Sequence, residues 1–115
     1  MNELALKNFQ THYASVKRHI FLCAEEKCFA ADENSRLQLW NHLKSLCKDH
    51  PQIMRSRAAC LRICADGPVA IVYPDGVIYH ALTESALTEI FDSHLLRGEV
   101  VEKYVLGHVG TQFSK

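Results

Sequence analysis

The sequence lacks the features that mark a membrane, secreted or disordered protein. Apolar runs such as Val69 to Tyr73 are far too short to span a bilayer. The first residues, Met1 to Asn8, lack the basic start and unbroken apolar stretch of a signal peptide, so we expect a cytoplasmic protein. With 115 residues, 48% of them hydrophobic and 23% charged, the chain is too apolar to be disordered and long enough to bury one core.

An excess of charge of one sign is also lacking. The 13 basic residues balance the 13 acidic ones, so no net field favours binding to nucleic acid or to an anionic membrane. The sequence contains no glycine-rich phosphate loop and no nucleophile-elbow sequence. These absences predict a binding or carrier protein rather than an enzyme, with no nucleic-acid and no membrane partner.

The first half of the chain predicts a βαβ unit. Residues 1–17 are polar and weakly periodic, which suggests an N-terminal arm, and the continuous apolar run at residues 19–23 is typical of a buried strand. A helix is expected from Asp32 or Ser35 to about Lys48, and a second strand at residues 53–58. Apolar residues at helical spacing form one stripe on that helix: Leu39, Trp40, Leu43, Leu46 and Cys47.

The second half predicts a hairpin and a last helix. Residues 69–73 and 77–79 are expected to pair as antiparallel strands about the turn Pro74-Asp75-Gly76. Thr83 can cap a helix that ends near Gly98, and residues 99–106 are expected to form a short extension. The apolar stripe of this helix is Leu87, Ile90, Phe91, His94 and Leu95. The order β-α-β-β-β-α predicts a thioredoxin-like α/β fold with a mixed four-stranded sheet and flanking helices.

Five cysteines are many for a reducing compartment, and the odd number argues against a closed disulfide framework. Cys23 and Cys28 are separated by four residues, and Cys60 and Cys64 by three. Each pair lies just beyond a predicted strand, and the ends of adjacent parallel strands meet at one edge of a sheet. We therefore expect the four thiols to converge there.

Four convergent thiolates are compatible with a [2Fe–2S] cluster, a structural zinc ion or two local disulfides. Zinc sites usually use tighter C-x₂-C pairs, and disulfides conflict with the expected compartment. A Rieske centre requires two histidine ligands, and no histidine is near these cysteines in sequence.

The cysteine pattern, together with two further motifs, resembles the thioredoxin-like [2Fe–2S] ferredoxins. This domain is also the small iron–sulfur subunit of respiratory complex I and of related hydrogenases. Beside the four cysteines, Gly67-Pro68 and Tyr73-Pro74-Asp75-Gly76-Val77-x-Tyr79 match the stand-alone members, and residues 94–101 match their last helix and tail. The resemblance covers residues 18–106, which sets off residues 1–17 as an arm and residues 107–115 as a C-terminal tail.

The resemblance implies a small one-electron carrier that holds a [2Fe–2S] cluster through Cys23, Cys28, Cys60 and Cys64, works with redox partner proteins and forms a homodimer. The x₄ gap in the first pair is shorter than in many stand-alone members and is similar to the complex I subunit. An alternative is therefore an electron-transfer subunit or assembly factor that docks on a larger redox enzyme. A zinc-binding thioredoxin-like domain is the third possibility.

Several other residues have both a structural and a functional interpretation. Cys47 on its helical stripe is expected to be a core thiol, and His94 a packed histidine rather than a ligand. Arg55, Arg57 and Arg62 could either bind an acidic partner or lie on a solvated strand edge. Arg62 stands where the family often has a glycine, which would let backbone N–H groups approach a cysteine sulfur.

Overall fold

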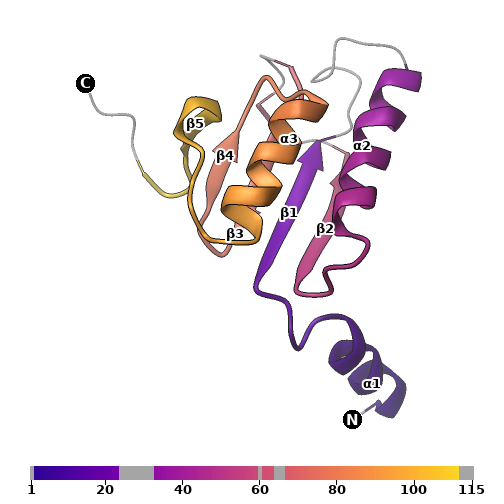
Figure 1. Cartoon of the computed structure of the whole chain (residues 1–115). Helices are drawn as coiled ribbons and strands as arrows, with labels where there is room; N and C mark the ends of the chain where they lie inside the picture. The colour runs from indigo at the N-terminus through magenta and orange to yellow at the C-terminus, as the bar shows by residue number, and fades with distance from the viewer. Residues whose placement is uncertain (1, 24–32, 60, 64–66, 112–115) are drawn as a thin grey trace.

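The structure is a computed structural model that describes residues 2–23, 33–59, 61–63 and 67–111. Figure 1 shows a sheet with two long helices against it and a third helix beyond one end. The elements in chain order are α1 (Glu3–His12), β1 (Arg18–Cys23), α2 (Glu33–Cys47), β2 (Ile53–Ala58), β3 (Ala70–Tyr73), β4 (Val77–Tyr79), α3 (Glu84–Ile90) with a π-helical continuation (Phe91–Leu95), a 3₁₀ turn (Glu102–Tyr104) and β5 (Val105–His108).

The sheet has the strand order β2-β1-β3-β4-β5. β1 and β2 are parallel and the other pairs are antiparallel, which confirms the predicted βαβ unit followed by a hairpin. The expected number of four strands was wrong, because the extension after residue 99 supplies a fifth that pairs with β4. This strand has only four residues, one of them Gly107, so it carries little of the alternating apolar pattern from which a strand is predicted.

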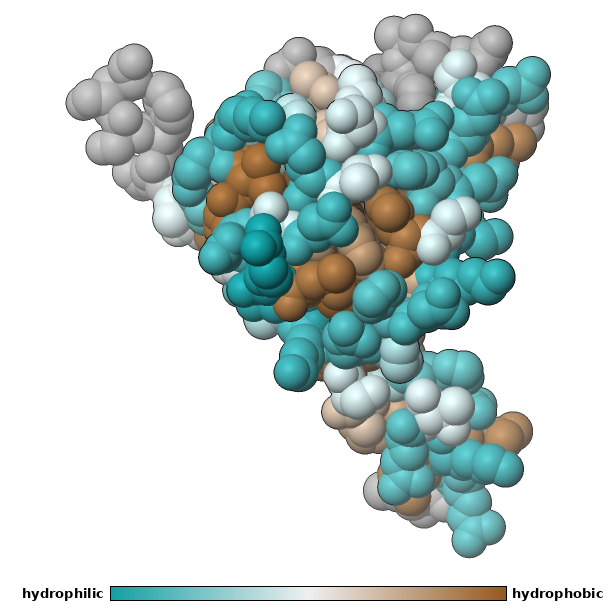
Figure 2. Space-filling view, viewed as in Figure 1, coloured by the Kyte–Doolittle hydropathy of each residue, from teal (hydrophilic) through white to brown (hydrophobic). Residues whose placement is uncertain are grey.

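The core lies between the sheet and the two helices. α2 and α3 cover the same face of the sheet in Figure 1. On β1, β3 and β4 the apolar side chains that point toward them are buried, whereas those on the other face are half-buried or exposed, except for Cys23 at the end of β1. On β1, for example, Ile20 and Leu22 are 0% and 1% exposed, and Phe21 between them is half-buried. Figure 2 shows apolar side chains between α2 and α3 framed by hydrophilic ones.

The last helix begins and ends as its sequence predicts. The Thr83 hydroxyl accepts a hydrogen bond from the Ala86 N–H at 3.1 Å, which satisfies one of the free N–H groups of the first turn. Gly98 adopts φ +78° after the π-helical turn, and its N–H donates to the His94 carbonyl at 2.8 Å. The capped start and end of this helix therefore fix the position of His94 over the sheet.

The N-terminal segment forms a helix that the sequence did not predict. α1 has no buried residue, and Leu4 and Phe9 are 67% and 54% exposed. Figure 1 places it beyond the N-terminal end of β1, away from the core. Without a buried face this helix shows only weak periodicity, which is why it could not be predicted from the sequence. Within the described residues, every helix is too short or too polar to cross a membrane.

Candidate metal centre

Cys23 is the one proposed ligand that lies within the described residues. It is the last residue of β1, its side chain is 0% exposed, and it takes no part in a disulfide. Since side chains alternate along a strand, Cys23 shares the face of His19 and Phe21, opposite to the helices. Although the Cys23 side chain is buried, it does not belong to the hydrophobic core cluster that α2 and α3 cover. Cys28, Cys60 and Cys64 lie outside the described residues.

The backbone around Cys23 brings the two cysteine-bearing loops to one edge. Cys23 pairs in parallel with Ala58, the last residue of β2, so the chain leaves both strands at the same edge. On its other side, the Cys23 N–H donates to the Val69 carbonyl at 2.9 Å. The loop that carries Cys60 and Cys64 therefore departs at Ala58 and returns at Val69, and Cys23 lies between these two points.

The segment between Cys60 and Cys64 contains an unusual backbone conformation. Arg62 adopts φ +67° in the left-handed region, while its neighbours Leu61 and Ile63 are half-buried. An L-residue there costs roughly 1–2 kcal/mol relative to the right-handed form, whereas glycine adopts it freely. A glycine at position 62 would adopt this conformation without that cost.

Cys47 is a core thiol, as its helical spacing predicts. It belongs to the hydrophobic core cluster and is 6% exposed. Burial raises the pKa of this thiol to about 11, and the nearby charge of Arg55 opposes the rise only in part. A thiol that stays protonated is a poor metal ligand, because the thiolate is the ligating form.

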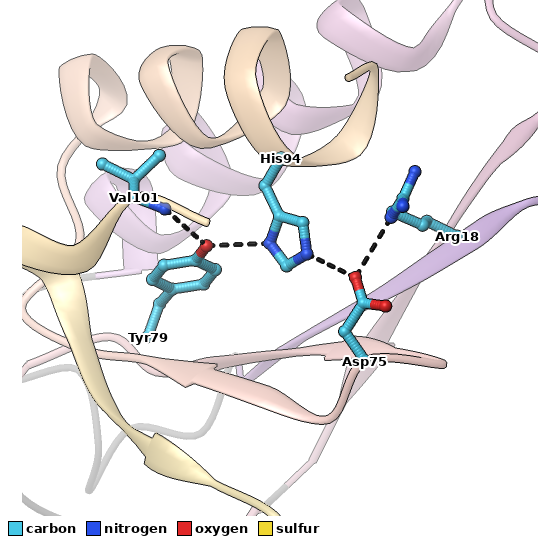
Figure 3. A network of polar contacts seen from close by, with 5 residues as sticks. All are labelled: Arg18, Asp75, Tyr79, His94 and Val101. Carbon is cyan, nitrogen blue, oxygen red and sulfur yellow. Dashed lines mark hydrogen bonds and ion pairs between the residues drawn. The ribbon is translucent and has the colours of Figure 1, made fainter. Parts of the chain in front are cut away.

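His94 is a packed histidine, as predicted, but it also forms the centre of a polar network that the sequence did not reveal. Figure 3 shows its imidazole between Asp75 and Tyr79, with Arg18 and Val101 at the two ends. The His94 side chain is 0% exposed, with Nε2 at 2.5 Å from an Asp75 carboxylate oxygen and Nδ1 at 2.8 Å from the Tyr79 hydroxyl. Arg18 Nε donates to the same carboxylate oxygen at 3.1 Å.

Both ring nitrogens of His94 have a hydrogen-bond partner. The carboxylate of Asp75 can only accept, so His94 Nε2 donates to it; in the neutral imidazole Nδ1 then accepts from the Tyr79 hydroxyl. The Tyr79 oxygen in turn accepts from the Val101 N–H at 3.2 Å. The hydrogen bond from His94, followed by that from Arg18, holds the pKa of the Asp75 carboxyl below its ordinary value, and burial raises the pKa of Tyr79.

The Arg18 and Asp75 end of this network lies at the edge of the sheet opposite to Cys23, while Tyr79, paired with Ala70, reaches in from the other end. Arg18 begins β1 and Asp75 lies in the turn between β3 and β4, whereas Cys23 ends β1. Asp75, Tyr79 and His94 were visible in the sequence as parts of two motifs, but nothing in either motif indicated that they meet. The network fastens the last helix and the C-terminal segment to the sheet rather than contributing to the cysteine-bearing edge.

The fold and the edge at Cys23 define a thioredoxin-like α/β domain, and comparison with known proteins identifies the family. No family model matches the chain. It is 33% identical over 95 residues to a 2Fe-2S ferredoxin of Clostridium pasteurianum, a match covering 76% of this chain and 93% of that protein. It is 30% identical over 99 residues to a 2Fe-2S ferredoxin of Aquifex aeolicus, covering 77% and 88%.

Solved structures agree. The chain resembles the thioredoxin-like [2Fe-2S] ferredoxin from Aquifex aeolicus with a TM-score of 0.70 and 27% identity, over 84% of this chain and 96% of that one. Two further similar structures are Cys-to-Ser variants of that ferredoxin, at two positions whose sequence separation equals that between Cys60 and Cys64. The chain therefore belongs to the thioredoxin-like [2Fe–2S] ferredoxins.

Proposed function

We propose that this protein is a one-electron carrier that binds a [2Fe–2S] cluster through Cys23, Cys28, Cys60 and Cys64. Membership of the family indicates the cluster and a small iron–sulfur electron carrier. The choice of these four ligands and the absence of a catalytic reaction are our proposal.

One observation carries the ligand set. Buried Cys23 lies between Ala58 and Val69, the two points at which the loop bearing Cys60 and Cys64 leaves and rejoins the sheet. Cys28 follows Cys23 by five positions, so the chain cannot carry it far from the same edge. Four thiols, one of them fixed and buried, fit the all-cysteine ligation of a [2Fe–2S] cluster.

The residues of this chain contribute rigidity and exclusion of water. When bound, such a cluster accepts one electron, which takes the charge of the cluster with its thiolates from about −2 to about −3. The strand ends at Cys23 and Ala58 are fixed by the register of β1 and β2, so Cys23 need not move as this charge changes. The full burial of Cys23 keeps solvent from its sulfur.

Spectroscopy of the purified protein tests the cluster. We expect a red-brown protein with about two irons and two labile sulfides per chain, and an electron paramagnetic resonance signal that appears only after dithionite reduction. A colourless protein prepared without air, or one that contains zinc and no iron, would contradict the proposal and support a zinc-binding domain.

Serine substitution tests the ligand set. Cys23→Ser, Cys60→Ser and Cys64→Ser should each alter or abolish the visible spectrum, because a thiolate ligand is lost. Cys47→Ser is the matched control: it removes a thiol from the core cluster and should leave the spectrum unchanged. The reverse pattern, with Cys47→Ser colourless and Cys28→Ser unaffected, would show that we have chosen the wrong ligands.

Electrochemistry of the isolated protein tests the alternative function. In that alternative the protein is an electron-transfer subunit or assembly factor for a larger redox enzyme. The short x₄ gap of the first cysteine pair favours this alternative. A reversible one-electron couple in the isolated protein would count against an obligate subunit. A couple that appears only in the presence of a larger enzyme would count against a free carrier.

We also propose that the protein forms a homodimer through the face of the sheet opposite to α2 and α3. Half-buried His19 and Phe21 stack there with ring centroids 4.0 Å apart, and Tyr73 meets Phe21 edge to face at 6.0 Å. Ile71, opposite Phe21 in the register, extends this apolar band. A second copy of the chain would remove these aromatic and aliphatic side chains from water.

A further inference from the structure

A cavity at the far end of β2 from Cys23 is lined by basic side chains from two helices and one strand. It has a volume of about 580 Å³ and lies between the end of α1, the last turns of α2 with the loop that follows, and the first half of β2. Five basic side chains line it: His12, Lys44, Lys48, His50 and Arg55. Cavities of this size are typical of sites for small molecules.

The cavity contains no compensating negative charge. No carboxylate lines it, and within the part of the chain that the structure describes Lys44, Lys48 and Arg55 form no ion pair. Cys47 also borders the cavity, and its raised pKa keeps its thiol uncharged. The positive charges therefore lie together with only solvent to screen them.

Arg55 is the most informative of these residues. Its Nε is buried and has no hydrogen-bond partner among the described residues. A guanidinium whose Nε is buried without an acceptor is unfavourable, and an oxyanion bound by the N–H groups of Arg55 that face the cavity would offset its charge. A guanidinium presents several N–H groups in one plane, which suits carboxylate and phosphate oxygens.

The helix dipole does not account for the whole arrangement. Lys44 and Lys48 are close to the C-terminus of α2, where positive charge is favourable, but they are four residues apart and repel each other. Arg55 comes from β2 and His12 from α1, and neither belongs to that helix end. A common ligand explains positive charges from separate elements around one cavity better than the dipole of α2 does.

The position of the cavity argues against the docking of a redox partner. It lies at the start of β2, whereas Cys23 is level with Ala58 at the other end of that strand. A partner that docked here would be far from the proposed cluster. A small ligand has no such requirement, so the cavity is independent of the proposed electron transfer.

We propose that this cavity binds a small oxyanion with two or more negative charges, either a phosphate compound or a polycarboxylate. Isothermal titration of the purified holoprotein with inorganic pyrophosphate and, separately, with citrate tests this, in buffers matched for ionic strength with chloride. We expect saturable one-to-one binding of at least one of the two, and the stronger binder identifies the type of oxyanion.

Arg55→Gln and Arg57→Gln form a matched pair of variants. Both remove one positive charge from β2, but Arg57 is exposed and does not line the cavity. Arg55→Gln should weaken binding about tenfold or more, because a charged hydrogen bond is lost, and Arg57→Gln should change it less than about twofold. Equal weakening in both variants, or no saturable binding of either anion, would overturn the proposal.

A second variant keeps the proposal testable if Arg55→Gln does not fold. If Arg55→Gln fails to fold, as judged by its far-ultraviolet circular dichroism, the exposed Lys48→Gln takes its place. Weaker binding in Lys48→Gln than in Arg57→Gln would then support the proposal. Identical binding in these two variants would overturn it.

Discussion

At the scale of single residues, the carboxylate of Asp75 supports a buried histidine. Asp75→Ala would leave the Nε2–H of fully buried His94 without an acceptor, which should destabilise the protein by about 1–3 kcal/mol. Asp75→Asn retains an oxygen acceptor and should cost less. Urea unfolding at pH 7 measures both, and Asp92→Ala, an exposed aspartate on the same helical turn as His94, is the control.

The effect of pH follows from the lowered pKa of Asp75. Because the folded pKa lies below the ordinary value of 3.8, the carboxylate stabilises the fold fully above that value and loses this contribution as the pH falls through the folded pKa. The stability difference between wild type and Asp75→Asn should therefore be largest at neutral pH and shrink below about pH 4. A difference that grows on acidification would contradict this assignment.

Cys47 should be chemically inert in the folded protein. With a pKa of about 11, roughly one thiol in a thousand is ionised at pH 8, and the side chain is buried as well. Iodoacetamide labelling followed by mass spectrometry should find Cys47 unmodified until the protein is unfolded. A cysteine introduced by Leu37→Cys on the exposed side of α2 is the control and should be labelled rapidly.

At the scale of elements, the cap of α3 supports the network below it. Thr83→Ala removes the acceptor for the Ala86 N–H and should destabilise the protein by about 1 kcal/mol. Thr83→Ser retains a hydroxyl and should restore most of this loss. Thermal unfolding of the two variants tests this, and equal melting temperatures would show that the hydroxyl does not act as a cap.

The elements that the sequence predicted are those with a buried face. β2 was predicted with its observed bounds, and β1 to within one residue, because both lie inside the sheet or against α2 and carry apolar patterns. α1 and β5 escaped prediction, because the first buries nothing and the second is short and interrupted by Gly107. The spacing of apolar residues reflects which side chains are buried, so a helix or strand that buries few side chains is hard to predict from the sequence.

The site was predictable in part for the same reason. The parallel pairing of Cys23 with Ala58 follows from the βαβ pattern, and so does the shared edge at which β1 and β2 end. The hydrogen bond from Cys23 to Val69 and the meeting of Asp75 with His94 depend on tertiary packing. No local spacing encodes such contacts.

At the scale of the whole molecule, the proposed homodimer can be broken by a charge on the open face of the sheet. Tyr73→Glu places a carboxylate among the ring contacts of that face, where its burial in an interface would be costly. We expect this variant to sediment as a monomer, whereas wild type sediments as a dimer. Leu37→Glu, similarly exposed but on α2, should remain dimeric. A wild-type monomer would refute the proposal.

The alternation of side chains along β1 links the core to the metal centre. Leu22 packs beneath the helices, and the next residue, Cys23, points to the opposite face. An insertion of one residue upstream of Leu22 would exchange the two, placing a leucine at the proposed ligand position and a thiol in the hydrophobic core, whereas an insertion of two would preserve both faces. The side-chain alternation of this six-residue strand thus ties the packing of the core to the proposed ligation by Cys23.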